Sequence, residues 1–458
     1  MGMSRGHWGS RLGFVLAAAG SAVGLGNLWK FPYITWENKG GAFVIVYLIA
    51  VFVLGLPIMM SEILIGRRAQ LSAVPAFETL GNRRWAVVGW LGVFAGAVIQ
   101  SYYMVIAGWS LRSFAQCLGW SFTTYQPPAD GDFSAFLANW PLQLGLTVVF
   151  TVLTAAIVFR GIGGGIEKAT KFMMPVLLII LLYLVGTALT MEGRSEAMAT
   201  MFTPRFGEMN PEGFLEAMGQ AFFSLSLGLG AMIAYGSYIS KKESIFKSAL
   251  AVVVLDTAVA LLACVAMFTI IYSVPGLQNR ISGSTVGMLF ITLPDLFYTK
   301  MPGGVVLGPA FFVLVSFAAL SSTISLGEVV ASLLIDRRGW SRGKATIFTT
   351  CLVFIGSIFA ALSLGAVPGL SSFEIFSGKQ GVLSSLDHLA ANYLLPAGGL
   401  LTTLFVGWKL GKKETLVELG LGRATVPFTI WLWIVRVVAP ASILYLLYSV
   451  VFSGKDFS

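Results

Sequence analysis

The sequence predicts an all-α membrane protein with eleven transmembrane helices. Only 11% of its 458 residues are charged, whereas soluble domains carry about 25% charged residues. The mean hydropathy is +0.82, and apolar segments of about 20 residues, the length that crosses a bilayer, recur along the chain. This pattern indicates a polytopic helical membrane protein rather than a set of soluble domains.

Eleven apolar segments are the expected membrane spans. We predict them at about 10–36, 41–70, 86–118, 142–160, 166–190, 211–239, 243–274, 305–336, 343–363, 380–408 and 425–453. Residues 1–458 are expected to form one domain, because both termini are short and no soluble regulatory unit is evident. The connections at about 119–141, 191–210 and 275–304 are longer than the others and are candidate outer caps.

The basic residues predict how the chain lies in the membrane. With the N-terminus in the cytoplasm, inside loops hold 20 of the 30 Lys and Arg residues, outside segments hold seven, and three fall within spans. This is the positive-inside pattern. The net charge of +9 is therefore a topology signal, and we expect no nucleic-acid partner. Eleven spans then place the C-terminus outside.

Several features bear on compartment and chemistry. Cys117, Cys264 and Cys351 lie in apolar segments, and an odd number of such thiols is no disulfide framework. His7 and His388, the two histidines, lie far apart, so a transition-metal site is not expected. The sequence contains no N-x-S/T sequon, the acceptor site for N-glycosylation. This favours a bacterial inner membrane. Membrane lipid is then the expected partner of the apolar surface.

Two similar tripeptides interrupt long apolar segments. Gly24-Leu25-Gly26 lies in the first span and Gly228-Leu229-Gly230 in the sixth. Glycine costs a helix roughly 1 kcal/mol relative to alanine, so each pair predicts a helix that breaks in mid-membrane. Lipid cannot satisfy the freed backbone groups, and a bound ion or solute would take them up. The alternative is close helix packing, because Gly20 to Gly24 is a GxxxG pattern.

The positions of the two breaks predict an inverted repeat. Five spans at about 10–190 are followed by five at about 211–408, with 425–453 as an extra helix. Because five is odd, the second unit is inverted relative to the first. Matched breaks in two inverted halves are typical of a secondary transporter with its site near the bilayer midplane.

Oxygen-bearing groups surround the first break. Gly20, Ala22 and Val23 could offer unpaired carbonyls, and Asn27 adds an amide oxygen. Clusters made only of oxygen suit hard cations. The first break is therefore a candidate cation site.

Hydroxyl groups gather near the second break and in the eighth span. Ser224 and Ser226 precede Gly228. The eighth span continues from Ala318 with three hydroxyls in a row, Ser321, Ser322 and Thr323. Half-helix N-termini suit a carboxylate and loose carbonyls suit an ammonium group, so a zwitterionic amino acid fits both. Its side chain would need an apolar pocket, which Tyr103 could close from one side.

Charged residues within the spans are expensive and are functional candidates by default. Three acids qualify: Glu62, Asp256 and Glu328. A Lys30–Asp387 pair would make an outer gate, and Arg5 with Asp336 an inner one. Exposed ion pairs are worth about 0–1 kcal/mol, which suits a gate that must open.

A set of motifs then occurs together in and after the first span: Trp8, Arg11-Leu12-Gly13, Ala22 to Asn27, Phe31-Pro32, Glu37-Asn38 and Gly40 to Phe43. They resemble the neurotransmitter:sodium symporter family. The resemblance extends over Gln220–Tyr238, Ala318–Ser322 and Asp336, and so covers nearly the whole chain. It implies sodium-driven uptake by alternating access, and not an enzyme.

The resemblance also implies the residues of each site. The first of two sodium sites would use Ala22, Asn27, Ser224 and Asp256. The second would use Gly20, Val23, Ala318, Ser321 and Ser322. The substrate would contact Ala22, Gly24, Leu25, Gly26, Tyr103, Phe223, Ser224, Ser226, Leu229 and Thr323. The cytoplasmic gate would include Arg5, Trp8, Tyr238 and Asp336.

Departures from the family pattern refine these expectations. Gly24 stands where amine transporters of the family carry aspartate, which leaves room for a substrate carboxylate and favours amino acids over amines; the resemblance to bacterial members implies hydrophobic amino acids. Lys30 replaces the usual arginine. Asp256 lies where many members have asparagine, and a fixed carboxylate there makes a chloride requirement unnecessary. The usual twelfth span is missing, so the sequence leaves the oligomeric state open.

Other functions stay open at this point. Another small zwitterion could be the substrate. A channel is disfavoured because the polar groups concentrate at two breaks instead of forming a continuous path. An intramembrane enzyme is disfavoured because the sequence shows no nucleophile–base motif.

Overall fold

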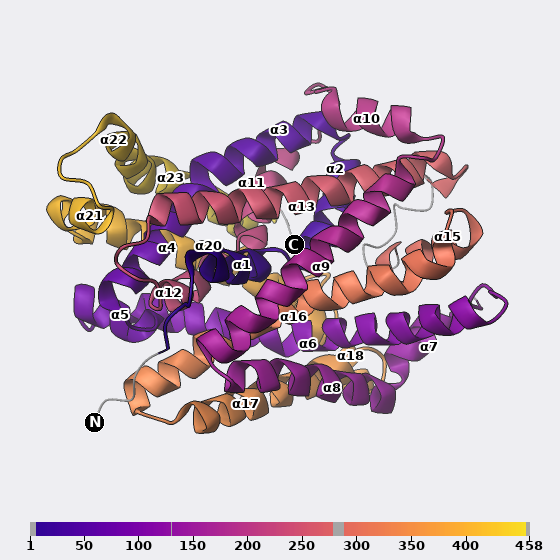
Figure 1. Cartoon of the computed structure of the whole chain (residues 1–458), viewed down its shortest axis with the longest axis horizontal. Helices are drawn as coiled ribbons and strands as arrows, with labels where there is room; N and C mark the ends of the chain where they lie inside the picture. Colours follow the sequence, from indigo (N-terminus) through magenta and orange to yellow (C-terminus); the bar gives the residue numbers. More distant parts are fainter. Residues whose placement is uncertain (1–5, 130, 278–287, 455–458) are drawn as a thin grey trace.

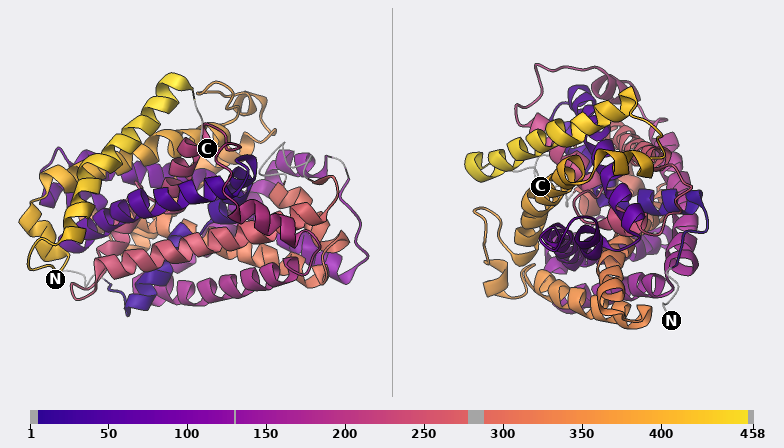
Figure 2. Two further views of the ribbon diagram at one scale, coloured as in Figure 1. Left: turned by 90° about the horizontal axis from the view of Figure 1, so that it is seen from above. Right: turned by 90° about the vertical axis from the view of Figure 1, so that its left-hand side faces the viewer.

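A computed structural model describes residues 6–129, 131–277 and 288–454. These residues form helices joined by turns, and the sole strand-like pairing among them is an isolated bridge between Glu374 and Gln380. The predicted all-α class is therefore confirmed. The helices lie side by side, most of them roughly along the long axis of the molecule (Figures 1 and 2).

Within the described residues, nine helical segments are long and apolar enough to cross a membrane: Gly41–Ala69, Ala86–Phe122, Trp140–Phe159, Ile162–Ala188, Ile245–Ser273, Gly304–Arg338, Arg342–Leu362, Val382–Lys409 and Val426–Ser453. Five are built on one long helix each: α6 (Ala86–Phe122), α8 (Trp140–Phe159), α13 (Ile245–Ser273), α16 (Gly304–Arg338) and α17 (Arg342–Leu362). The other four include a π-helical turn that joins or precedes α-helices: α3 (Gly41–Ile49) with α4 (Leu56–Ala69), α9 (Glu167–Ala188), α19 (Val382–Leu389) with α20 (Leu395–Leu404), and α22 (Val426–Trp433) with α23 (Ala439–Ser453).

The first predicted span is a bent pair of helices. Helix α1 (Arg11–Ala22) ends at the first glycine pair, and a π-turn (Gly26–Lys30) leads into α2 (Phe31–Glu37). The two halves meet at an angle of 56°. Counting this pair as one span gives ten candidate spans in the described part of the chain.

The sixth predicted span is also interrupted. Helix α11 (Gly213–Ser224) and helix α12 (Ala231–Gly236) are each too short to cross a bilayer. Between them the backbone takes positive φ values at Ser226 (52°), Gly228 (79°) and Gly230 (72°). Both glycine pairs therefore mark helix ends, as their sequence predicted.

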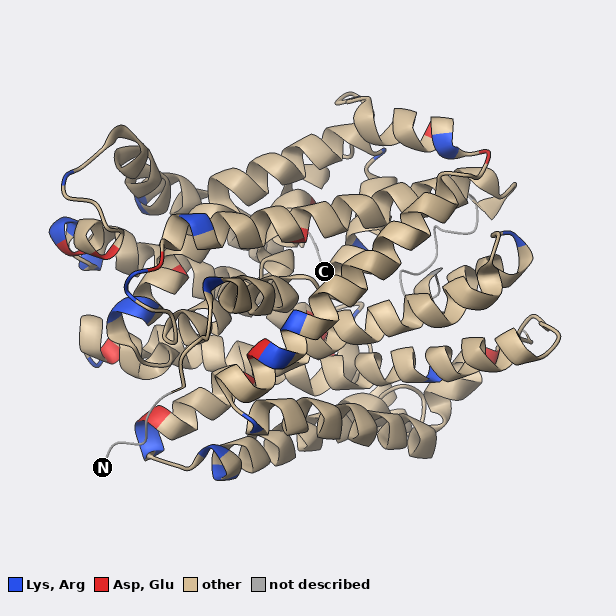
Figure 3. Cartoon of the chain, in the orientation of Figure 1, with Lys and Arg blue, Asp and Glu red and all other residues tan. Residues whose placement is uncertain are grey.

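Short helices close the two ends of the bundle. Six lie outside the spans: α5 (Ala73–Leu80), α7 (Asp132–Ala138), α10 (Arg194–Phe202), α15 (Leu293–Thr299), α18 (Pro368–Ser371) and α21 (Lys412–Glu418). Lys and Arg gather at the end of the molecule that carries α5, α21 and the start of α17 (Figure 3). The last turns of α4 and α16 add two arginines each at that end: Arg67, Arg68, Arg337 and Arg338.

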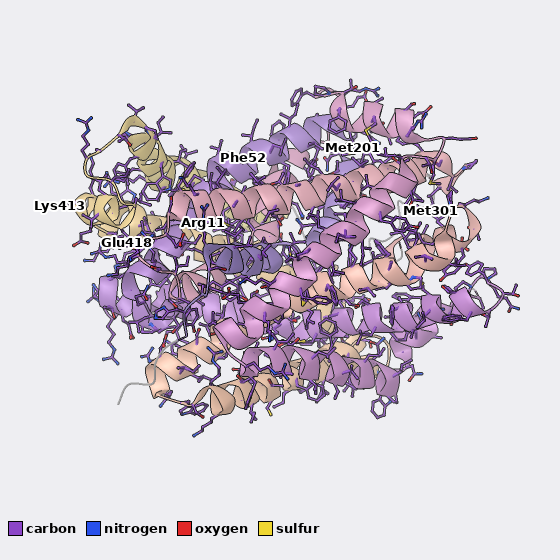
Figure 4. The ribbon with its side chains drawn as sticks, in the orientation of Figure 1. Arg11, Phe52, Met201, Met301, Lys413 and Glu418 are labelled. Carbon is purple, nitrogen blue, oxygen red and sulfur yellow. The ribbon has the colours of Figure 1, made fainter. Side chains whose placement is uncertain are left out.

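Side chains that consist mostly of carbon project from the outer helices (Figure 4), and large apolar side chains are found both exposed and buried. Phe52, labelled on the outer side of the second span, is 39% exposed. Inside, α6 packs along α16, and α1 packs against α9, α13 and α16. The break in the first span therefore lies deep among long helices rather than at the lipid-facing surface.

The second break depends on contacts from two neighbouring helices. The Gly228 N–H donates to Glu62 Oε1 of α4 at 2.7 Å, so an in-span acid caps the unwound segment. A Cβ atom on Gly228 would overlap the carbonyl oxygen of Leu395 in α20. Gly228 is thus required both for its positive φ and for this close approach.

We expect Gly228→Ala to lower the unfolding temperature far more than Gly420→Ala. Both glycines have positive φ, 79° and 73°, which costs an L-residue roughly 1–2 kcal/mol. Only Gly228 also meets a neighbouring backbone, since a Cβ on Gly420 would find no atom within 4 Å. Thermal unfolding of the detergent-solubilised variants measures the difference, and equal losses would show that the contact with Leu395 is unimportant.

Candidate substrate and ion site

A small buried cavity of about 40 Å³ lies between the two helix breaks. Eight residues predicted to contact a solute line it: Ala22, Gly24, Gly26, Tyr103, Phe223, Ser224, Ser226 and Leu229. They come from α1, α6, α11 and the two unwound segments. Apolar side chains contribute most of the lining, with hydroxyl groups at a few points.

Hydrogen bonds tie the first break to its surroundings. The Ser226 hydroxyl donates to the Ser21 carbonyl at 2.9 Å, and the Ser322 hydroxyl lies 3.4 Å from the same oxygen. The Leu25 N–H donates to the Tyr103 hydroxyl at 3.1 Å. A Cβ on Gly24 would lie 2.9 Å from Ser322 Oγ. Side chains of α6 and α16 thus reach the unwound backbone, and Gly24 permits this approach.

A buried cluster of polar side chains lies next to the first break. Asn27 Nδ2 donates to Asp256 Oδ1 at 2.8 Å and to Ser224 Oγ at 3.1 Å. The Ser224 hydroxyl donates to Asp256 Oδ2 at 2.6 Å. Asn27 Oδ1 accepts the Gly24 N–H at 3.1 Å. Three of the four residues predicted for the first ion, Asn27, Ser224 and Asp256, are therefore in mutual contact, and Asp256, fully buried, supplies a carboxylate.

Sequence reasoning missed one member of this cluster. The Tyr47 hydroxyl in α3 lies 3.4 Å from Ser224 Oγ, and its side chain is completely buried. Tyr47 sits in an apolar run and carries no pattern that separates it from an ordinary packed aromatic residue.

The residues predicted for the second ion also lie together. Ser321 Oγ and Ser322 Oγ both donate to the Ala318 carbonyl, at 3.0 and 3.2 Å. Gly20 faces this turn, since a Cβ on it would lie 3.0 Å from the Ser321 Cβ. Val23 leaves the helical conformation with ψ 101°. Gly20 of α1 thus lies beside the turn of α16 that carries these two hydroxyls, and hydroxyl and carbonyl oxygens are a donor set that suits a hard cation.

Two residues predicted to contact the substrate do not line this cavity. Thr323 does not line the cavity; its hydroxyl lies 2.9 Å from that of Thr154 in α8 and donates to the Leu320 carbonyl at 3.0 Å. Successive helical residues point about 100° apart, and here Ser322 faces the cavity while Thr323 points toward α8. Leu25 is likewise absent from the lining and contributes only its backbone N–H.

The cavity has further lining residues that the sequence did not single out: Ser21, Ile99, Ser322 (predicted only for the ion), Ser325, Leu326 and Leu395. Helical spacing could have found some of them, because Ser325 and Leu326 follow Ser322 by three and four residues. Leu395 lies in a different span, and no pattern in the sequence marks it as a lining residue. The Ser21 and Ser325 hydroxyls are 2.7 Å apart at this wall.

One residue of the predicted outer gate, Lys30, lies beside the cavity. The Lys30 ammonium lies 5.0 Å from the centre of the Phe223 ring, which lines the cavity. Lys30 therefore lies against Phe223 in this conformation, and the Lys30–Asp387 gate pair stays a prediction.

Two of the predicted cytoplasmic gate residues, Trp8 and Tyr238, belong to one connected network. Trp8 Nε1 donates to the Tyr235 carbonyl at 3.0 Å, and the Trp8 N–H donates to the Tyr238 carbonyl at 3.3 Å. The Tyr238 hydroxyl donates to Glu328 Oε1 at 2.7 Å. The third in-span acid, Glu328, is also paired with Arg342 at 2.7 Å.

The inner ion pair falls partly outside the structure. Asp336 Oδ2 accepts the Ser72 N–H at 2.7 Å. Arg5, its predicted partner, lies outside the described residues.

Comparisons with known proteins agree with this arrangement. The family model described as "Sodium:neurotransmitter symporter family" matches residues 5–129 and 134–457. The chain is 36% identical over 442 residues to an uncharacterized sodium-dependent transporter, YhdH, of Bacillus subtilis, with 96% of each chain covered. It is 25% identical to the sodium-dependent nutrient amino acid transporter 1 of Drosophila willistoni, covering 86% of this chain and 69% of that one.

A solved structure has the same fold. The crystal structure of MhsT in complex with L-phenylalanine matches with a TM-score of 0.88 and 40% sequence identity, and the match covers 97% of this chain and all of MhsT.

We expect Ser224→Ala to lower the unfolding temperature, because Asp256 loses the hydroxyl that donates to it. Leaving a buried acceptor without its donor costs about 1–3 kcal/mol. Ser332→Ala is the matched control, since that buried hydroxyl donates only within its own helix, to the Val329 carbonyl at 3.1 Å. If both variants unfold at the same temperature, the Asp256 network contributes nothing to stability.

Proposed function

The chain belongs to the sodium:neurotransmitter symporter family, and on that premise we propose that it is a sodium-coupled symporter that takes up hydrophobic L-amino acids. As a member of this family it is a sodium-dependent membrane transporter and not an enzyme. The proposal adds the substrate class, the two sodium ions and the direction of transport.

One observation carries the substrate proposal: a mostly apolar cavity lies between two helix ends and beside a buried cluster of oxygen atoms. An amino acid presents a carboxylate, an ammonium group and an apolar side chain. The helix ends and the oxygen cluster suit the charged groups, while Ile99, Leu229 and Leu326 suit the side chain. Position 24 is glycine, so no protein carboxylate occupies the place of the substrate's own.

The volume of the cavity indicates how the substrate enters. About 40 Å³ has room for only a few water molecules. An amino acid therefore requires the lining helices to separate, as alternating access demands. Phe223 lines the cavity and has Lys30 over its ring. In this proposal it moves with the outer gate when the substrate enters.

Two sodium ions travel with the substrate in this proposal. The first contacts Ala22, Asn27, Ser224 and Asp256, and its site lies against the substrate carboxylate. The second contacts Gly20, Val23, Ala318, Ser321 and Ser322. Contacts among Asn27, Ser224 and Asp256 support the first assignment, and the position of Gly20 beside Ser321 supports the second. Because Asp256 provides a fixed negative charge beside the first ion, transport does not require chloride.

The proposed architecture has eleven spans, with inverted repeats at about 10–190 and 211–408 and an extra helix at about 425–453. The N-terminus is cytoplasmic and the C-terminus is outside, in a bacterial cell membrane. The gathering of Lys and Arg at one end of the molecule supports this orientation (Figure 3).

Uptake into proteoliposomes tests the proposed function. Radiolabelled hydrophobic amino acids should accumulate with an inward sodium gradient, saturate with concentration, and fail to accumulate when choline replaces sodium. A panel of side-chain sizes defines the substrate range. Ohmic single-channel currents in place of saturable uptake would contradict a transporter.

Asn27→Ala should weaken both sodium and amino acid binding by about tenfold, the effect of losing about 1.4 kcal/mol of interaction. The side chain contacts both Ser224 and Asp256 and caps Gly24. Sodium dependence of uptake gives the apparent affinity. Asn210→Ala is the control, since that exposed amide makes one long contact, 3.4 Å, to the Glu37 carbonyl. Unchanged sodium dependence in Asn27→Ala would remove Asn27 from the site.

Asp256→Asn should make uptake dependent on chloride or abolish it, because the fixed charge beside the first sodium ion is lost. Uptake is compared in chloride and gluconate media. Asp132→Asn, which alters an ion pair with Arg112 outside the site, should transport equally in both. Normal uptake by Asp256→Asn without chloride would show that Asp256 does not replace the anion.

A further inference from the structure

A second small cavity lies behind the wall of the substrate cavity, between α6, α8, α16 and α17. Its volume is about 10 Å³. Neighbouring residues of the same helix line the two cavities: Ile99 and Tyr103 of α6 face the first, and Gln100 and Met104 face the second. On α16, Leu326 lines the first cavity and the next residue, Gly327, lines the second. The two cavities therefore lie against different sides of the same two helices, α6 and α16.

Five threonines line this second cavity: Thr151, Thr154, Thr346, Thr349 and Thr350. The first two lie on α8, and the other three lie on α17. Their spacings of three and four residues place each group on one face of its helix. Two neighbouring membrane helices thus direct hydroxyl groups toward the same point.

The hydrogen bonds around the cavity are incomplete. Among the described residues, the hydroxyls of Thr151, Thr346 and Thr349 and the Gln100 Oε1 atom are buried and make no hydrogen bond. All four groups belong to residues that line this cavity. Thirteen side-chain polar atoms of the described residues are unpaired in this way, so nearly a third of them gather at one place.

Such a concentration is costly if the cavity is dry. Each buried polar group without a partner costs about 1–3 kcal/mol, and such groups are rare in native proteins. By contrast, Thr154 and Thr350 are satisfied, since their hydroxyls donate to the Phe150 and Thr346 carbonyls at 3.1 and 2.8 Å. The unpaired groups therefore point to a small polar ligand.

We propose that this cavity binds one water molecule, which bridges α6, α8 and α17. A volume of about 10 Å³ matches the space that a single water needs. The three hydroxyl groups need acceptors for their hydrogens, and the Gln100 oxygen needs a donor. A water molecule accepts two hydrogen bonds and donates two, so it can accept hydrogens from two of these hydroxyls and donate to the Gln100 oxygen and to the oxygen of the third hydroxyl, whereas a cation accepts no hydrogen bond. The lining also contains no carboxylate to balance a cation's charge.

The bridging water supports the wall of the substrate site through Gln100. The Gln100 Nε2 atom donates to the Thr323 carbonyl at 3.1 Å and so joins α6 to α16. Its other amide atom, Oε1, is one of the four unpaired groups. Water bound to Oε1 fixes the Gln100 amide on the side of α6 that faces the second cavity, whereas Ile99 and Tyr103 face the substrate cavity. This site goes beyond the proposed transport function and would exist whatever the substrate is.

Thr151→Val and Thr349→Val test the proposal, because each replaces a hydroxyl with a methyl group of nearly the same shape. If water bridges these hydroxyls, both variants unfold at a temperature several degrees lower, since the water loses a partner. If the hydroxyls are unpaired in a dry cavity, removing them leaves the unfolding temperature unchanged or raises it, and the proposal fails. Thr147→Val is the control, one turn earlier on α8, where the hydroxyl donates only to the Gln143 carbonyl.

Two further measurements identify the ligand. A crystal structure at a resolution that shows ordered water should contain density within hydrogen-bond distance of at least two of the four groups; an empty cavity would overturn the proposal. The unfolding measurements are repeated with choline in place of sodium. Water predicts the same loss for Thr349→Val in both salts, while a loss seen only in sodium would identify a cation and overturn the assignment to water.

Discussion

Unpaired backbone groups at two helix breaks are the constraint on which the rest of the structure depends. Both breaks lie in the apolar interior, where lipid offers no hydrogen bonds. The protein supplies partners from neighbouring helices: Tyr103 accepts the Leu25 N–H, and Glu62 accepts the Gly228 N–H. Ser226 joins one break to the other through the Ser21 carbonyl. Residues from both breaks line one cavity, and the proposed site lies there.

A buried carboxylate beside the first break is a second constraint on the structure. An isolated charge in an apolar interior is strongly disfavoured, yet Asp256 is completely buried beside the first break. Donors from Asn27 and Ser224 stabilise it. In the proposed cycle a sodium ion adds a positive charge at the same point. The substrate carboxylate and the Asp256 carboxylate then attract the same sodium ion. The ion and the amino acid therefore favour each other's binding.

Much of the fold was predictable from the sequence, because hydropathy and glycine act locally. The nine helical segments and the bent pair match predicted spans to within a few residues, and both glycine pairs mark the ends of helices. The rotation of a helix about its axis was harder to predict. Consecutive hydroxyls did not reveal that Ser322 faces the cavity while Thr323 faces α8. Contacts between distant spans, such as Leu395 with Gly228 and Tyr47 with Ser224, left no local signal at all.

The central claim is that sodium and an amino acid bind together between the two breaks, and their linkage tests it most directly. Equilibrium binding of a hydrophobic amino acid to the purified protein is measured over a range of sodium concentrations, and sodium binding over a range of amino acid concentrations. Shared coordination predicts that each ligand tightens the other by the same factor. Amino acid binding of equal affinity in sodium and in choline would contradict the account.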